Sequence, residues 1–432
     1  MRRCFAILAV VVCILLSSFV LVERSCARPL VNTIRMIGPI DPATAIYVHR
    51  SISIAEANHA QAVIVLMNTP GGLLDSTKSI IQDFYTSSVP IIVYVWPETA
   101  RAASAGAIIT LGANVAAMSP STNIGAAHPV SVTGGQPDAV MAKKIENDTA
   151  AFVRGIAEKR HRPLKWADEV VRESASLTEN EARKQGIIDI IANNQQDLLK
   201  KLDGRKVDMS SGPVTIRSAD AEIEQIEPTL RERFLHAIDD PNITYILMAL
   251  AIYGLIFELS NPGAILPGVV GGICLILSLF SMAVVPVNLT GIFLIVFAVA
   301  LFLIDLHVPT HGILTVGGVI SFAVGSLMLF ETGSPGFQIS VTLVISVVLL
   351  TGAFFMFAVG SGIRAQKNKI ITGVEGMIGE VVEAMTDIDP VGKVFTEGSW
   401  WTARTEGEPI KKGEKVRIVA MEKLALIVKK AQ

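Results

Sequence analysis

The chain has 432 residues, of which 51% are hydrophobic and 18% are charged, and its mean hydropathy is +0.51. This composition argues against a soluble cytoplasmic enzyme and favours an exported domain attached to a membrane domain. The 37 basic and 39 acidic residues give a formal net charge of -2, which lacks the basic excess that binding to nucleic-acid phosphates requires, so we expect no nucleic-acid partner.

The first residues have the pattern of a targeting segment. Arg2 and Arg3 precede an uncharged apolar stretch from Phe5 to Val22, and the small residues of Ser25-Cys26-Ala27 follow at the spacing that a signal peptidase recognises. We predict a cleaved signal peptide over residues 1–27, with an uncleaved membrane anchor as the alternative. In either case the domain that follows is exported.

Residues 241–363 form an apolar block that predicts a multi-span transmembrane domain. Within it only Glu258, Asp305 and Glu331 carry formal charge, and a membrane-spanning helix needs about 20 apolar residues. Gly and Pro breaks divide the block into five predicted spans, near residues 243–259, 264–285, 289–306, 312–330 and 339–361. Because the first span is short and ends on Glu258, four spans with an interfacial helix is the alternative. The absence of charge in mid-span favours a packed anchor over a transporter.

The charges that flank the block indicate its orientation. Arg364, Lys367 and Lys369 follow the last span, whereas the short loops between spans carry no Lys or Arg. The positive-inside rule therefore places the C-terminal tail in the cytoplasm. Five spans then place the N-terminal domain outside the cell membrane, in agreement with the leader.

Residues 28–240 alternate short apolar runs with segments of helical period, which predicts an exported α/β domain. The predicted elements are strands at Ala62–Met67, Pro90–Val95 and Val115–Met118, helices at Leu73–Phe84 and from Ala107 onward, and a turn over Ser121–Ala127. Gly71-Gly72 follows a strand and frees backbone N–H groups to approach a ligand oxygen. Ser104 precedes an apolar helix. Alone, each has a structural alternative, a turn for the glycines and a helix cap for Ser104.

The combination of motifs resembles the Clp-protease/signal-peptide-peptidase superfamily. In chain order the matching segments are Asn68-Thr69-Pro70-Gly71-Gly72, Ala103-Ser104-Ala105-Gly106, Ser121-Thr122-Asn123-Ile124-Gly125-Ala126-Ala127, Leu177-Thr178-Glu179-Asn180-Glu181-Ala182 and Gly186-Ile187-Ile188-Asp189. With the membrane block and the tail, the chain is most similar to the long-form NfeD proteins, described as membrane-bound Clp-class serine proteases. The resemblance implies a Clp/crotonase-like fold for the exported domain.

The resemblance also implies a serine and lysine catalytic pair. The nucleophile of the family motif falls on Ser104, and the general base falls on Lys144, with the adjacent Lys143 as the alternative register. A lysine can act as a base only where its pKa is lowered towards neutrality and where it reaches the serine oxygen. The resemblance also implies that backbone N–H groups of Gly71 or Gly72 and of Ala105 would bind the oxyanion.

His128 supports a rival mechanism. It lies close to where soluble Clp proteases place a triad histidine, so a Ser104–His128–Asp triad is the alternative, with Asp168 or Asp189 as the orienting carboxylate. The segment Ile145–Lys159 has the pattern of an amphipathic helix that continues from the lysine, as expected for the Ser/Lys pair.

Residues 370–432 predict a small all-β domain. Its period-2 segments are Gly376–Val382, Gly392–Val394, Trp400–Ala403, Lys412–Val419 and Leu424–Val428. The resemblance identifies it as an NfeD-type OB-fold domain. Its mixed Glu and Lys content favours contact with a protein over contact with nucleic acid.

The leading hypothesis is a serine endopeptidase that cleaves hydrophobic segments of membrane-associated proteins. The resemblance implies a stomatin-like membrane protein as partner, a role in membrane-protein quality control and assembly into a homo-oligomer. We expect no cofactor and no metal, since the four cysteines, Cys4, Cys13, Cys26 and Cys274, lie in apolar segments without the spacing of a zinc site or disulfide framework. The alternative is a catalytically silent scaffold that organises stomatin-like partners. An acyl-CoA enzyme has only fold kinship in its favour.

Overall fold

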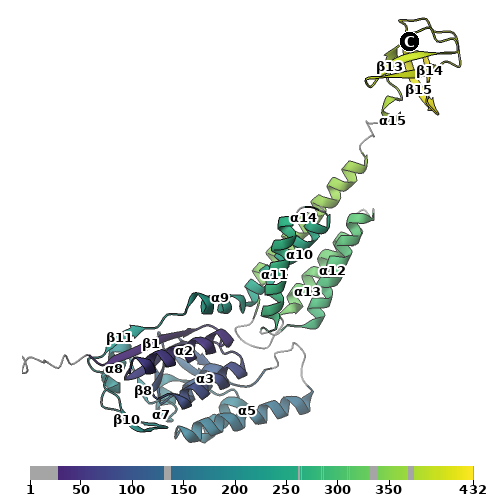
Figure 1. The fold of residues 1–432 in the computed structure, drawn as a ribbon. Helices are drawn as coiled ribbons and strands as arrows, with labels where there is room; N and C mark the ends of the chain where they lie inside the picture. Colours follow the sequence, from purple (N-terminus) through teal and green to yellow (C-terminus); the bar gives the residue numbers. More distant parts are fainter. Residues whose placement is uncertain are drawn as a thin grey trace, which may run out of the picture. The chain divides into compact units, whose positions relative to one another are not determined.

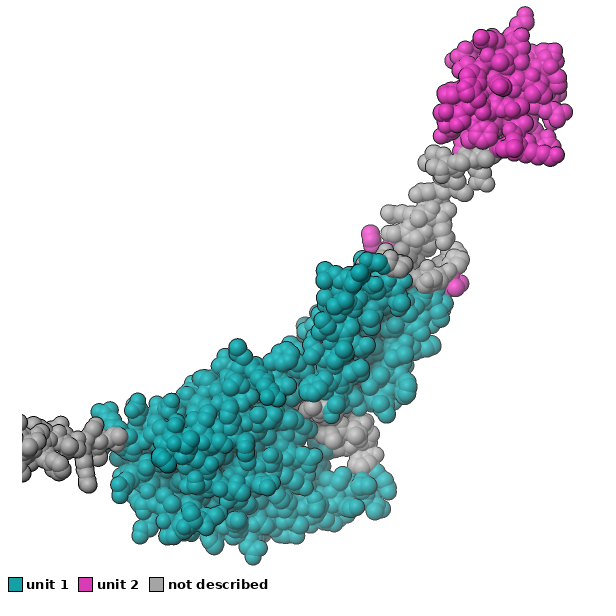
Figure 2. Space-filling model, in the orientation of Figure 1, with its two compact units in different colours: residues 1–304, 313–353 teal, residues 305–312, 354–432 magenta. Residues whose placement is uncertain are grey.

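The computed structural model describes residues 28–130, 138–260, 263, 265–283, 285, 287–308, 310, 312–330, 338–367 and 374–431. The chain divides into two compact units, residues 1–304 with 313–353 and residues 305–312 with 354–432 (Figure 2). The predicted signal peptide, residues 1–27, lies outside the described residues.

The N-terminal domain contains a parallel six-stranded sheet, as the buried apolar runs predict (Figure 1). Its strand order is β11 (Glu222–Gln225), β1 (Leu30–Ile37), β2 (Ala62–Asn68), β3 (Ile91–Val95), β5 (Val115–Met118) and β8 (Ile190–Ile191). Strands β3 and β5 are buried along their whole length, and β2 is buried to Met67. The three strands predicted from the apolar runs are therefore confirmed, β5 at both ends and β2 and β3 to within one residue.

Helices cover one face of this sheet and form the larger core. They are α2 (Pro42–Ala57), α3 (Leu74–Thr86), α4 (Ala105–Gly112), α5 (Ala139–Lys159), α6 (Leu164–Arg172) and α7 (Glu179–Lys184). Successive side chains of a strand point to opposite faces of the sheet. In β2, Val63 and Val65 belong to this core, whereas Ile64 and Leu66 belong to the core on the other face. That second core is closed by α8 (Gln195–Leu202) and by the hairpin of β9 (Lys206–Met209) and β10 (Gly212–Thr215).

A second, three-stranded sheet lies beyond the carboxyl end of β2. It comprises β4 (Arg101–Ala103), β6 (Asn123–Gly125) and β7 (Ser176–Thr178), and a bridge between Thr69 and Ala102 joins it to the chain that leaves β2. The prediction of a simple turn over Ser121–Ala127 is therefore wrong in part. The segment contains strand β6, whose pairing with two partners distant in sequence has no local signal.

The apolar block forms five helices at the positions predicted for the spans. They are α10 (Pro241–Ser260), α11 (Ile265–Met282), α12 (Leu289–His307), α13 (Ile313–Leu329) and α14 (Val341–Lys367). Helices α10 and α11 are long and apolar enough to cross a bilayer, and the other three contain shorter apolar stretches, Leu289–Asp305, Ile313–Leu329 and Val341–Phe357. The first helix is therefore longer than expected, and a crossing by all five stays a prediction.

Glycines bring α10 and α11 into backbone contact. A Cβ atom on Gly271 would lie 3.0 Å from the Cα of Gly254, whereas a Cβ on the adjacent Gly272 would meet nothing within 4 Å. Small residues at such positions allow close helix packing, which gains dispersion contacts along the pair.

We expect Gly271→Leu to lower the thermal stability of the detergent-solubilised protein, because the added side chain must separate the two helices. Gly272→Leu is the matched control and should leave the melting temperature within about 1 °C, as an open position on a helix surface. Size-exclusion chromatography after a temperature series measures both. Equal loss of the folded peak in the two variants would show that the contact between Gly271 and Gly254 does not stabilise the packing of α10 against α11.

The C-terminal unit is an all-β domain, as predicted. Its sheet has the order β12 (Val381–Glu383), β15 (Lys415–Glu422), β16 (Ala425–Lys430), β14 (Ser399–Arg404) and β13 (Val391–Thr396). A bridge between Ala384 and Val394 links the two edges, so the sheet closes on itself. One expectation is wrong: Gly376 and Met377 belong to a short helical turn, α15 (Val374–Met377), and the first strand begins only at Val381.

Candidate active site

Ser104 lies on a strained turn between β4 and α4. Its φ of 52° and ψ of -116° lie in a region that non-glycine residues rarely adopt, and its N–H donates to the carbonyl of Gly125 at 2.8 Å. The side chain makes no capping bond to α4, so the helix-cap alternative is wrong for its hydroxyl. Among the described residues the hydroxyl has no hydrogen-bond partner and is therefore available for chemistry.

Gly71 packs directly against Ser104. A Cβ on Gly71 would lie 2.8 Å from the Ser104 Cβ and 3.2 Å from its Oγ, and its φ of 129° is accessible mainly to glycine. Its N–H already donates to Thr69 Oγ1 at 3.1 Å. Gly71 therefore lets the backbone approach Ser104 closely, but it does not offer a free N–H group there.

Two other backbone amides beside the serine are unoccupied. Within the described chain, the N–H groups of Gly72 and Ala105 have no hydrogen-bond acceptor. Ala105 is the first residue of α4, where the helix leaves its N–H groups unpaired and favours negative charge. Of the three residues predicted as oxyanion donors, Gly72 and Ala105 therefore have unoccupied amides in the described chain, whereas Gly71 does not.

A neighbouring segment holds in place the loop of residues 68–73, which contains Gly71 and Gly72 and is called the glycine loop below. Ile40 donates its N–H to the carbonyl of Gly71 at 2.9 Å and accepts from the N–H of Leu73 at 2.8 Å. A Cβ on Gly72 would lie 2.3 Å from the Ile40 oxygen, so this packing requires glycine. The sequence carries no signal for Ile40, because its role comes from backbone pairing with a loop distant in the chain.

Lys144 lies on the exposed N-terminal half of α5, and no hydrogen bond joins it to Ser104 in the described structure. With Lys143 it lines a shallow concavity that also includes Ala139, Val140 and Asn147. The two lysines differ in their contacts, since Lys143 Nζ lies 3.5 Å from Glu146 Oε1. The predicted helix after Lys144 is confirmed and begins earlier, at Ala139.

The structure does not assemble the alternative triad. His128 is exposed, and its Nδ1 lies 2.9 Å from the carbonyl oxygen of Val171, which can only accept a hydrogen bond. Asp168 instead contacts Arg154 and Arg172, and although burial acts to raise its pKa, these bonds hold that pKa below its usual range.

Asp189 is likewise committed elsewhere. Its carboxylate accepts from Arg162 at 3.1 Å, from Arg205 at 2.9 Å and from the N–H of Ala116 at 2.8 Å. The prediction that Asp168 or Asp189 orients His128 is therefore wrong, because arginines on neighbouring elements pair with both carboxylates.

Comparisons with known families match each part of the chain. Residues 30–224 match the NfeD1b N-terminal domain, residues 242–360 the NfeD integral membrane domain, and residues 374–430 the NfeD-like C-terminal, partner-binding domain. These three matches follow the domain order predicted from the sequence.

Relatives match over nearly the whole length. The chain is 35% identical over 438 residues to the membrane-bound protease PH1510 of Pyrococcus horikoshii, covering 99% of this chain and 98% of that protein. It is 26% identical over 421 residues to the membrane protein NfeD1b of Bacillus subtilis, covering 90% of each. A lysine-to-alanine variant of the 1510-N membrane-bound stomatin-specific protease, solved with a substrate peptide, matches at 32% identity and a TM-score of 0.45, covering 48% of this chain and 97% of that one. The chain therefore belongs to the NfeD family and is a membrane protein related to a membrane-bound protease.

Proposed function

We propose that this protein is a membrane-bound serine endopeptidase that cleaves apolar segments of membrane-associated proteins. The observation that carries the proposal is the arrangement around Ser104, whose turn is strained and packs against Gly71. Among the described residues, its hydroxyl and the N–H groups of Gly72 and Ala105 have no hydrogen-bond partner. The 35% identity to a membrane-bound protease over nearly the full length supports it.

The proposed reaction divides the work among four groups. Ser104 Oγ attacks the substrate carbonyl carbon, and Lys144, as a neutral amine, accepts the hydroxyl proton. The N–H groups of Gly72 and Ala105 stabilise the oxyanion of the tetrahedral intermediate. Lys144 then protonates the leaving amine. A water molecule, deprotonated in turn by Lys144, attacks the acyl-enzyme, and Lys144 returns this proton to Ser104 Oγ as the second product leaves.

We further propose five membrane crossings with the protease domain outside and the C-terminal domain in the cytoplasm. The apolar helices at all five positions and the basic residues after the last one support this orientation. We assign the closed C-terminal sheet to the OB-fold and give it a stomatin-like membrane protein as partner, in keeping with its match to a partner-binding domain. Assembly into a homo-oligomer and cleavage of the leader complete the proposal.

A catalytically silent scaffold is the second candidate. The observation in its favour is the exposure of Lys144 and the lack of a hydrogen bond between it and Ser104. In that case the exported domain would bind partners without cleaving them.

Peptide cleavage by the purified full chain distinguishes the two candidates. The chain and its Ser104→Ala variant are incubated with apolar peptides and with polar control peptides, and mass spectrometry identifies the products. We expect cleavage of the apolar peptides by the unaltered chain and none above background by Ser104→Ala, since the nucleophile is missing. Identical behaviour of the two proteins on every peptide would reject the protease and favour the scaffold.

A further inference from the structure

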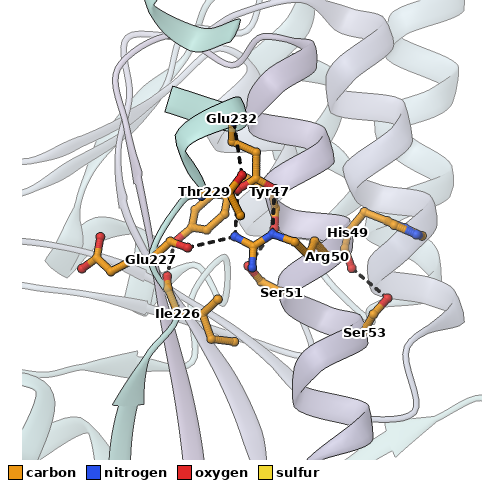
Figure 3. Close-up of polar contacts among 9 residues, drawn as sticks. All are labelled: Tyr47, His49, Arg50, Ser51, Ser53, Ile226, Glu227, Thr229 and Glu232. Carbon is orange, nitrogen blue, oxygen red and sulfur yellow. Dashed lines mark hydrogen bonds and ion pairs between the residues drawn. The ribbon is translucent and has the colours of Figure 1, made fainter. Parts of the chain in front are cut away.

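The segment that precedes the first membrane helix is fastened to the exported domain. Helix α9 (Leu230–Ile238) contacts α2 through a paired bond in which Arg50 Nε and Nη2 lie 2.7 and 2.8 Å from the two carboxylate oxygens of Glu232 (Figure 3). The Glu232 side chain is only 5% exposed and also accepts from the N–H of Thr229, which caps α9. A bidentate pair of this kind fixes both position and orientation.

The chain leading into α9 is held by the same face of α2. The Tyr47 hydroxyl donates to the carbonyl of Ile226 at 2.6 Å, and Arg50 Nη2 donates to the carbonyl of Glu227 at 2.9 Å (Figure 3). Side chains from α2 thus satisfy the carbonyl groups of Ile226 and Glu227, in the segment that leads into α9. The position of α9 on α2 is set by several independent bonds.

At the other end of α9, a histidine meets a buried carboxylate. His236 Nδ1 forms a hydrogen bond with Asp41 Oδ2, and Asp41 is only 2% exposed. The second oxygen of Asp41 accepts from the N–H and the hydroxyl of Thr44, each at 2.7 Å, and so caps α2. Asp41 therefore joins the start of α2 to the end of α9.

Asp41 directly follows the residue that holds the glycine loop. Ile40 pairs through its backbone with Gly71 and Leu73, and Gly38 donates its N–H to the carbonyl of Asn68 at 3.1 Å. Residues 38–41 therefore run alongside residues 68–73, which carry the glycine in contact with Ser104. A shift of Asp41 would displace the backbone on which the oxyanion donor lies.

We propose that Asp41 and His236 are positioning residues, which hold residues 38–41 against the glycine loop so that the Gly72 N–H is aimed at the oxyanion. The proposal rests on the proposed protease function for its catalytic meaning. The structural part of the proposal, that His236 on α9 keeps the glycine loop ordered, does not depend on that function.

This arrangement connects the site to the membrane helices. The carbonyl of Ile238, the last residue of α9, accepts from Thr244 Oγ1 of α10 at 3.1 Å and from Ser281 Oγ of α11 at 2.7 Å. A contiguous set of hydrogen bonds therefore runs from two membrane helices through α9 and Asp41 to the glycine loop.

The contact between His236 and Asp41 also depends on pH. The hydrogen bond that the His236 ring donates to Asp41 raises the pKa of His236 against the effect of burial, and burial raises the pKa of the nearby Asp239 to about 6. The other charged groups that face His236 are Asp240, Arg35, Glu232 and Arg233. Because the folded-state pKa of His236 is raised, its contribution is complete below its ordinary value of 6.5 and is lost as the pH rises through the raised value.

The experiment is hydrogen exchange with mass spectrometry on the full chain in detergent. His236→Leu removes the bond, and Asp41→Asn removes the charge while keeping a residue that caps α2. The matched control is His49→Leu, because His49, on α2, likewise pairs with a carboxylate, that of Asp83 at 3.0 Å, away from the site. We expect exchange of residues 68–77 to rise about tenfold in the first two variants and to be unchanged in the control.

Two further readouts separate positioning from general stability. The kcat for peptide cleavage should fall about tenfold in both variants with KM unchanged, since the loop acts on the transition state. In the unaltered chain, protection of residues 68–77, corrected for intrinsic exchange, should decrease as the pH rises from about 6 to about 9, and Asp41→Asn should flatten this dependence.

Unchanged exchange of residues 68–77 in both variants would overturn the positioning role, whatever the activity. Cleavage that is absent even from the unaltered chain would reject the protease function alone, and the exchange result would then decide the positioning role by itself.

Discussion

Replacing Lys144 with alanine is expected to lower kcat for cleavage of apolar peptides by about a thousandfold, with little change in KM. The lysine is proposed to take the proton from Ser104 and to return it to the leaving amine, and general acid–base groups contribute rate factors of about 10²–10⁴. Substrate binding does not depend on this transfer, so the loss falls on kcat. Single-turnover cleavage assays on the full chain, read by mass spectrometry, measure it.

Lys143→Ala is the matched control for the adjacent position. Its Nζ lies 3.5 Å from Glu146 Oε1 in an i,i+3 pair, and the Lys143 side chain is exposed to solvent, so the pair contributes little to stability and activity should stay within about twofold. If Lys143→Ala loses activity and Lys144→Ala keeps it, Lys143 is the general base instead of Lys144.

His128→Ala provides the test of the other mechanism. The Nδ1 of His128 is directed at the Val171 carbonyl, and neither Asp168 nor Asp189 is a partner of the ring in the described structure. We expect unchanged cleavage in this variant. Loss of activity in His128→Ala together with full activity in Lys144→Ala would make the histidine the base.

Gly71→Ala is expected to reduce cleavage at least about a hundredfold while the protein stays folded. The new methyl group would lie 2.8 Å from the Ser104 Cβ and 3.2 Å from its Oγ, so the nucleophile must move, and a displacement of about 1 Å can cost two orders of magnitude. The φ of 129° adds strain, because alanine rarely adopts this conformation. Activity and melting temperature are measured on the same preparations.

Gly155→Ala is the control for this change. Gly155 lies within helix α5 and a Cβ there would meet nothing within 4 Å, so alanine should preserve activity and raise stability slightly through its higher helix propensity. If Gly71→Ala cleaves as fast as the unaltered chain, the close approach to Ser104 has no catalytic role. If it unfolds, the glycine serves mainly the fold.

The positions of the main elements were predictable because they follow from local properties of the chain. Strands β2, β3 and β5 are continuous apolar runs, since a parallel strand covered on both faces has no polar side. The domain order and the membrane block follow from composition in the same way. Ser104 and the paired glycines were found because each belongs to a short motif.

Contacts between distant segments decided what the sequence left open. The choice of Gly72 over Gly71 as a donor depends on whether Thr69 occupies the amide, and the loss of the triad depends on arginines that lie beside Asp168 and Asp189 only in the folded chain. The link from His236 to Asp41 joins residues near opposite ends of the domain. Sequence by itself therefore determined which segments are buried and which motif carries the proposed nucleophile, because burial and short motifs are local properties of the chain. Hydrogen bonds between remote groups determined the partners, because a donor's acceptor is settled only when the chain has packed.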